Sequence, residues 1–409
     1  MRPYLRRGIG GFARQRGPAL DGGGSRPGRA PPFERARLVG VVALLGGSAT
    51  PDGTAGFRDR GVEDRRLPAG HFRSAPGGLT LTSLGLGTYI GPPDGPTDLA
   101  VEQAVTIALT SGRINVLDTA INYRHQRAER SIGRALARLL ERDEVERSEV
   151  FVATKAGYLA PDGEARMPPD EWIRRELYDR KILRAADVVD DCHAMTPRYL
   201  ADQFERSRRN LGLETIDLLY LHNAPDAQLA AVGREEFDRR LESAFVILEE
   251  LREKGQLGAY GLATWDCLRS ARSDPGYYPL EAAVRLAERV GGRGHGFRFI
   301  QFPFNLAMPE AAAVRNQPVG PERTTLFEAA ERLGVACFTS VPLFQGQLAR
   351  AGPKRPGLSP AQTAIQFARS APGTLAPLVG QKTSEHLAEN LEIASLPPWD
   401  GAAFRELLP

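Results

Sequence analysis

The sequence has few of the residues that mark several common classes of protein. It holds three cysteines among 409 residues, far apart at Cys192, Cys267 and Cys337, which excludes a disulfide scaffold and suits free thiols. The six histidines are dispersed and no HExxH or CxxC motif occurs, so we expect no metal site. No apolar run approaches the ~20 residues of a membrane span. The net charge of +3 does not favour a nucleic-acid partner.

What charge there is lies unevenly along the chain. Residues 1–37 contain nine arginines against two acidic residues, together with eight glycines and five prolines. Such a composition cannot bury enough apolar surface to offset its ordering entropy, so residues 1–47 are predicted to be a disordered Arg/Gly/Pro-rich extension. The apolar run Leu38–Leu45 resembles a short signal peptide but also suits a segment that packs on the domain. Given the free thiols, we expect a cytoplasmic protein.

Residues 48–409 are predicted to form one α/β domain. Short apolar runs alternate there with stretches of helical periodicity, eight times over about 310 residues. The runs are Leu84–Leu86, Asn115–Leu117, Val150–Thr154, Ile216–Leu221, Ala259–Leu262, Phe299–Gln301, Ala336–Thr339 and Pro377–Val379. Apolar strands between helices indicate a covered parallel sheet, and eight such units fit a closed (β/α)8 TIM barrel better than an open sheet.

Four polar side chains follow three consecutive predicted strands. Asp118, Lys155 and His222 stand at the ends of strands two, three and four, and Tyr123 lies in the loop after Asp118. Chemistry in such barrels occurs at the C-terminal ends of the strands, so these four are the candidate catalytic residues. Each alone has an ordinary structural explanation, as a helix cap, a solvated lysine or a core histidine; their placement on one rim favours a shared function.

This set suits proton donation to a carbonyl group. A tyrosine is too weak an acid at neutral pH, but a cation such as Lys155 is expected to lower its pKa. Asp118 can hold Lys155 in place, and His222 can donate a hydrogen bond to the substrate oxygen. Because none of these four side chains is a strong nucleophile, the group that adds to the carbonyl carbon must come from another molecule. This indicates a hydride from a nicotinamide cofactor.

Three motifs resemble those of the aldo-keto reductases. DTAINY at 118–123, VFVATK at 150–155 and the stretch from Ser207 to His222 occur in the family's order. The resemblance covers residues from about 84 to 390 and is greatest with uncharacterised bacterial members that have a long loop after the lysine strand. It implies a tetrad of Asp118, Tyr123, Lys155 and His222 and NAD(P)(H)-dependent reduction of an aldehyde or ketone, or the reverse oxidation. The expected partner is therefore a small carbonyl or alcohol substrate.

The resemblance also implies a set of cofactor-binding positions. They are Thr88, Tyr89, Thr264 and Gln301 near the nicotinamide, Leu343, Gly346 and Leu348 around the pyrophosphate, and Gly380, Lys382, Glu389 and Asn390 at the adenosine end. Lys382 would meet a 2′-phosphate, which favours NADP(H) over NAD(H), although His386 stands at a common arginine position. Ala263-Thr264 and Val341 also depart from the family's usual Ser-Asn and Ser.

The segment 156–196 is far longer than a usual connection between a strand and a helix. It carries Trp172, Tyr178, Cys192 and His193, so it suits either a wall of the substrate site or a decoration outside the barrel. His193 is either a polar group behind the site or a structural residue.

Two alternative functions stay open at this point. A nucleotide-binding regulatory subunit would use the same barrel without turnover. A Schiff-base lyase would use Lys155 as a nucleophile, which an ion pair with Asp118 would prevent.

Overall fold

The computed structural model describes residues 44–380 and 383–408, and eight of its strands close into a parallel barrel. In order around the barrel they are β11 (Ala336–Ser340), β12 (Thr374–Gly380), β3 (Gly85–Gly87), β4 (Val116–Asp118), β5 (Phe151–Ala156), β6 (Ile216–His222), β7 (Leu257–Ala263) and β8 (Phe297–Pro303). All eight predicted strands overlap these, so the (β/α)8 prediction is confirmed.

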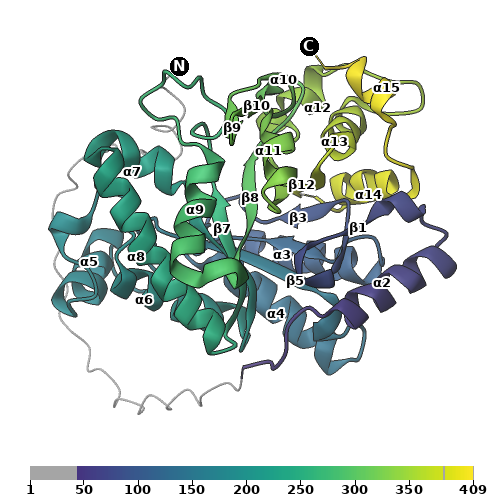
Figure 1. The fold of residues 1–409 in the computed structure, drawn as a ribbon. Coiled ribbons are helices and arrows are strands. Elements are labelled where there is room, and N and C mark those ends of the chain that lie inside the picture. The colour runs from purple at the N-terminus through teal and green to yellow at the C-terminus, as the bar shows by residue number, and fades with distance from the viewer. Residues whose placement is uncertain (1–43, 381–382, 409) are drawn as a thin grey trace, which may run out of the picture. The chain divides into compact units, whose positions relative to one another are not determined.

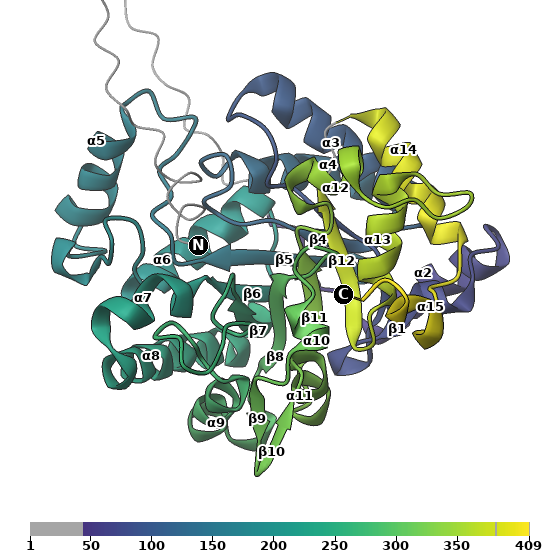
Figure 2. The ribbon, with the colours of Figure 1, turned by 90° about the horizontal axis from the view of Figure 1, so that it is seen from above.

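Helices surround the barrel, as Figures 1 and 2 show. The helices between or after the barrel strands are α3 (Gly95–Thr110), α4 (Arg127–Glu141), α6 (Pro197–Leu211), α8 (Arg234–Glu253), α9 (Leu280–Gly291), α11 (Leu326–Arg332), α13 (Pro360–Ser370) and α14 (Ser384–Glu392). Shorter or peripheral helices are α2 (Pro51–Glu63), α5 (Pro169–Ile173), α7 (Ala224–Val232), α10 (Glu310–Ala313), α12 (Gln347–Ala351) and α15 (Gly401–Arg405). Among the described residues, no helix is long and apolar enough to cross a membrane.

Two antiparallel hairpins accompany the barrel. The first is β1 (Phe72–Ser74) with β2 (Thr80–Thr82), and the second is β9 (Gln317–Val319) with β10 (Glu322–Thr324). Leu81 of β2 is fully buried and packs with the side chains inside the barrel. Since β2 directly precedes β3, this hairpin closes the N-terminal end of the barrel and leaves the opposite end for the site.

The barrel has a core on each side of its sheet. Inside, Phe151, Phe299 and Phe338 pack with ring centroids 5.6–6.1 Å apart. Outside, alternate strand residues such as Val152 pack against apolar helix faces, including Phe204 of α6. A strand buried on both faces is largely apolar, which is why these strands appear in the sequence as nearly continuous apolar runs.

Helix α6 begins at Pro197, and proline is favoured at the first helical position. It ends at Gly212, whose positive φ of 69° lies in the left-handed region that glycine adopts without strain.

The first described residues contact the domain. Residues 1–43 of the predicted extension lie outside the described residues. Leu45, however, donates its N–H to Gly212 O at 2.7 Å and accepts from Glu214 N at 2.9 Å. Leu45 therefore pairs with the segment between α6 and β6, and its side chain packs against the apolar core.

Candidate active site

The four predicted catalytic residues meet at the C-terminal ends of three adjacent strands. Asp118 ends β4, Lys155 is the penultimate residue of β5, and His222 ends β6. Tyr123 lies in the turn between β4 and α4, with its ring centroid 4.8 Å from Lys155 Nζ and 5.7 Å from that of His222. The barrel therefore brings together all four side chains.

A buried ion pair lies at the bottom of the site. Lys155 Nζ donates to Asp118 Oδ2 at 2.6 Å and to Thr119 O at 2.7 Å, and Gln301 Nε2 donates to the other Asp118 oxygen at 2.8 Å. Burial raises the pKa of Asp118 and lowers the pKa of Lys155, while their mutual attraction opposes both shifts. Every hydrogen bond around the pair favours its charged form.

Tyr123 does not have the lowered pKa that the sequence leads us to expect. Burial, and then the negative charge of Asp118, raise its pKa well above the ordinary value. The prediction of a lowered pKa is wrong for the free site, because burial removes the phenol from water and the Asp118 carboxylate paired with Lys155 disfavours the phenolate. At neutral pH the phenol thus holds its proton.

His222 is held as a neutral imidazole. Burial, reinforced by the charge of Lys155, lowers its pKa well below the ordinary value. Its Nδ1 lies 3.2 Å from Asn122 Oδ1, and the ring of Tyr158 packs edge-on against it with centroids 5.0 Å apart. Asn122 and Tyr158 are neighbours of the site that the sequence analysis missed; the only signal was their position next to Tyr123 and just beyond Lys155.

The turn that carries Tyr123 is strained and anchored by ion pairs. Arg124, His125 and Gln126 all have positive φ, from 49° to 70°, which costs non-glycine residues on the order of 1 kcal/mol or more each. Arg124 is almost fully buried and donates to Asp98 Oδ1 at 2.6 Å, while Arg127 donates to Oδ2 at 2.6 Å.

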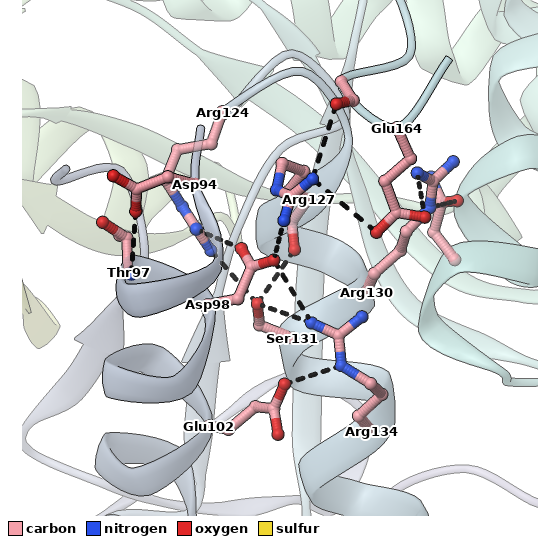
Figure 3. A network of polar contacts seen from close by, with 12 residues as sticks. Asp94, Thr97, Asp98, Glu102, Arg124, Arg127, Arg130, Ser131, Arg134 and Glu164 are labelled. Carbon is pink, nitrogen blue, oxygen red and sulfur yellow. Dashed lines mark hydrogen bonds and ion pairs between the residues drawn. The ribbon is translucent and has the colours of Figure 1, made fainter. Parts of the chain in front are cut away.

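Figure 3 shows that these contacts belong to a larger network between α3 and α4. Arg134 and Arg138 pair with Glu102, one turn further along α3 from Asp98. Arg130 pairs with Asp162 at 2.7 Å, and Gln126 Nε2 donates to Ala160 O at 2.9 Å. The turn after Tyr123 is therefore fixed from one side by α3 and from the other by the segment 156–196.

The positions predicted for the nicotinamide lie on the same rim. Thr88 follows β3 and donates from Oγ1 to Asp118 O at 3.1 Å. Thr264 follows β7 and donates from its N–H to Gln301 O at 2.7 Å. Tyr89 is 60% exposed, and its ring packs edge-on against Tyr123 with centroids 5.0 Å apart.

The positions predicted for the rest of the cofactor lie after β11 and β12. Leu343, Gly346 and Leu348 belong to the loop and short helix after β11, where Val341, Phe344 and Gln345 have positive φ. Gly380 ends β12, and Asn390 is buried on α14. Glu389, also on α14, accepts a hydrogen bond from Ser359. Lys382 lies outside the described residues.

The segment 156–196 has an outer part and a part beside the barrel mouth. Trp172 and Tyr178 pack in a separate apolar cluster of the segment, and Cys192 is half-buried. Tyr158 and His193 instead lie at the barrel mouth beside His222. Among the described residues, no group of three or more side chains suited to a metal ion occurs.

Comparison with known proteins gives the family. The model of the Aldo/keto reductase family matches residues 83–283, which contain all four predicted catalytic residues. Residues 83–283 belong to the aldo/keto reductase family. Family membership supports an oxidoreductase.

Individual relatives of the chain are distant. Pyridoxal 4-dehydrogenase of Microbacterium luteolum is 29% identical over 47% of the chain, and D-threo-aldose 1-dehydrogenase of a Pseudomonas species is likewise 29% identical over 47%. The matches span only 56% and 52% of the lengths of those two proteins.

Among solved structures, the holo form of aldo-keto reductase AKR11C1 from Bacillus halodurans resembles this chain with a TM-score of 0.55 and 17% identity. That likeness covers 83% of this chain and 96% of the other, and at this identity it supports the fold alone.

Proposed function

We propose that the chain is an NAD(P)(H)-dependent oxidoreductase that reduces an aldehyde or ketone to an alcohol, or catalyses the reverse oxidation. The observation that carries the proposal is the position of a protonated phenol, Tyr123, over the Lys155 ammonium and beside the neutral ring of His222. A bound nicotinamide would supply the hydride.

The residues on the rim fit a nicotinamide. Gln301 donates a hydrogen bond from its amide nitrogen to Asp118. Its Oε1 has no hydrogen-bond partner among the described residues, so this oxygen can accept a hydrogen bond from a carboxamide. Thr264 lies beside it and offers a hydroxyl oxygen.

Tyr123 is the proposed general acid. Its raised pKa keeps the proton on the phenol until the substrate oxygen becomes a strongly basic alkoxide. The phenolate that remains is then stabilised by Lys155, whose position is fixed by Asp118 and Thr119 O. Preorganised charge of this kind is most effective in a buried site.

His222 is proposed to orient the substrate carbonyl. A neutral imidazole donates from one nitrogen only, so donation from Nε2 requires that Nδ1 carry no proton, which a hydrogen bond donated to Nδ1 favours. The side-chain amide of Asn122 supplies that bond when its nitrogen faces Nδ1; the two orientations of such an amide are nearly isosteric.

The geometry argues against the two alternatives. Lys155 is fully buried and donates to two oxygens, so it is a poor nucleophile for a Schiff base. A regulatory subunit would have no use for the ion pair beneath Tyr123.

The test combines cofactor titration with turnover. We expect NADPH to quench protein fluorescence with tighter binding than NADH, because Lys382 is proposed to meet the 2′-phosphate, and we expect oxidation of NADPH with at least one compound of a carbonyl panel. Tyr123→Phe should bind NADPH as the wild type does and lose about 10²–10⁴-fold in kcat.

Tyr178→Phe is the matched control, because it removes a phenol hydroxyl within the separate cluster of the segment 156–196. Wild-type turnover by Tyr123→Phe would refute the assignment. Cofactor binding without any turnover would favour the regulatory alternative.

A further inference from the structure

The segment 156–196 places two of its side chains directly behind His222. Its two ends pair as a short antiparallel bridge between Tyr158 and His193, with Leu159 N donating to Cys192 O at 2.8 Å and Ala194 N donating to Gly157 O at 2.9 Å. The bridge follows the end of β5, which brings both side chains to the wall of the site.

His193 contacts the main chain of His222 by a hydrogen bond of fixed direction. Its Nε2 lies 2.9 Å from His222 O, and its Nδ1 lies 2.9 Å from Gln228 Nε2. The amide of Gln228 cannot turn over freely, because its Oε1 accepts from Arg240 Nη1 at 3.0 Å. Gln228 therefore donates to Nδ1, which leaves the proton of His193 on Nε2, facing the carbonyl of His222.

The packing around this bond is close on every side. His193 and Gln228 are both fully buried. Gly157 has a φ of 135°, and a Cβ atom there would lie 2.5 Å from His193 Nε2, so glycine is needed at this position. The ring of Tyr158 stands edge-on to both His193 and His222, with centroids 5.1 and 5.0 Å away.

We propose that His193 is a positioning residue for His222, acting through the hydrogen bond to its main-chain carbonyl and through the ring of Tyr158. The carbonyl of His222 belongs to the peptide that leads into Asn223, which has a positive φ of 51°. Fixing that peptide and one face of the imidazole sets the direction in which His222 points. This inference rests on the proposed function of His222 as the group that orients the carbonyl.

The experiment compares three variants for turnover, cofactor binding and the histidine ring signals in NMR. His193→Leu removes the donor, and kcat is expected to fall about fivefold or more, which is the factor that corresponds to the roughly 1 kcal/mol of one hydrogen bond. The dissociation constant of NADPH should stay within twofold. His193→Gln can still donate and accept, and it should recover most of kcat. Gln228→Met removes the bond that fixes the tautomer of His193, together with the bond from Arg240, but keeps the bond from His193 to His222 O, and it should give a smaller loss.

The NMR measurement uses ¹⁵N-labelled histidine, with the His222 signals assigned through His222→Asn. The chemical shifts of the His222 ring should change in His193→Leu and regain nearly their wild-type values in His193→Gln. This measurement needs no substrate, so it can be read even if the proposed function fails. Leu177→Ala, in the separate cluster of the same segment, is the control for general loosening. Unchanged His222 signals and kcat in folded His193→Leu would overturn the inference, as would an equal loss in Leu177→Ala. If His193→Leu does not fold, unchanged signals in Gln228→Met would overturn it.

Discussion

Replacing Asp118 by Asn should destabilise the protein strongly although it changes one atom. Lys155 has no exposed surface, and its ammonium lies 2.6 Å from the Asp118 carboxylate, so the substitution leaves a buried positive charge without its counterion. The new amide nitrogen would also face Nζ, donor against donor. Its oxygen can still accept from Gln301, so this part of the site is kept.

The cost follows from the burial of the pair. Removing one partner of a buried ion pair destabilises a protein by about 3–5 kcal/mol, because the remaining charge is uncompensated. Part of this cost is relieved by loss of the lysine proton: without the attraction of Asp118, burial lowers the pKa of Lys155 further. Lys155→Met should cost a similar amount, since it leaves the carboxylate alone.

The double variant separates this explanation from simple loss of packing. Asp118→Asn with Lys155→Met contains no buried charge and loses mainly the hydrogen bond to Thr119 O, so it should cost about 1–2 kcal/mol. Urea unfolding of the cofactor-free protein at pH 7 measures all four free energies of the cycle. A double variant as unstable as the sum of the two single variants would refute the reasoning, as would a cost below about 1 kcal/mol for Asp118→Asn.

Two further predictions concern regions outside the tetrad. Asp98→Asn should lower the free energy of unfolding by about 3 kcal/mol, because it leaves the buried guanidinium of Arg124 unpaired. The control in the same urea assay is Asp59→Asn, which should cost less than about 1 kcal/mol because the ion pair of Asp59 is exposed. Stability should also fall as the pH is lowered from about 6.5 toward 3, since burial holds the pKa of His71 at about 3 and the unfolded chain binds this proton first. His71→Asn should show a shallower dependence of unfolding free energy on pH over that range, and an unchanged slope would contradict the assignment.

The barrel was predictable because its strands are buried on both faces. Such strands are largely apolar, and all eight appear in the sequence as short apolar runs between amphipathic stretches. The order of packing around the barrel then follows from the closed parallel topology, and the ends of consecutive strands bring Asp118, Lys155 and His222 to one rim.

The electrostatics of the site could not be predicted in the same way. The sequence places a lysine near Tyr123 but does not indicate how much water the fold removes from the phenol, and burial proves to dominate the pKa. The contacts of Tyr158 and His193 depend on how a 41-residue connection folds back on the barrel mouth, which no periodic pattern specifies. Likewise, nothing in the sequence indicates that three consecutive residues after Tyr123 have positive φ.

These observations fit one electrostatic design. In the free site, Asp118 and Lys155 cancel each other, while Tyr123 and His222 are neutral because burial disfavours their charged forms. Transfer of the Tyr123 proton to a nascent alkoxide would create a phenolate beside the Lys155 ammonium, which is already in place. The negative charge would thus move from the substrate oxygen to the phenol oxygen and remain next to a positive charge. A raised pKa in the free site is therefore compatible with general acid catalysis: the phenol need only be more acidic than the alcohol being formed, and the fixed lysine stabilises the phenolate that remains.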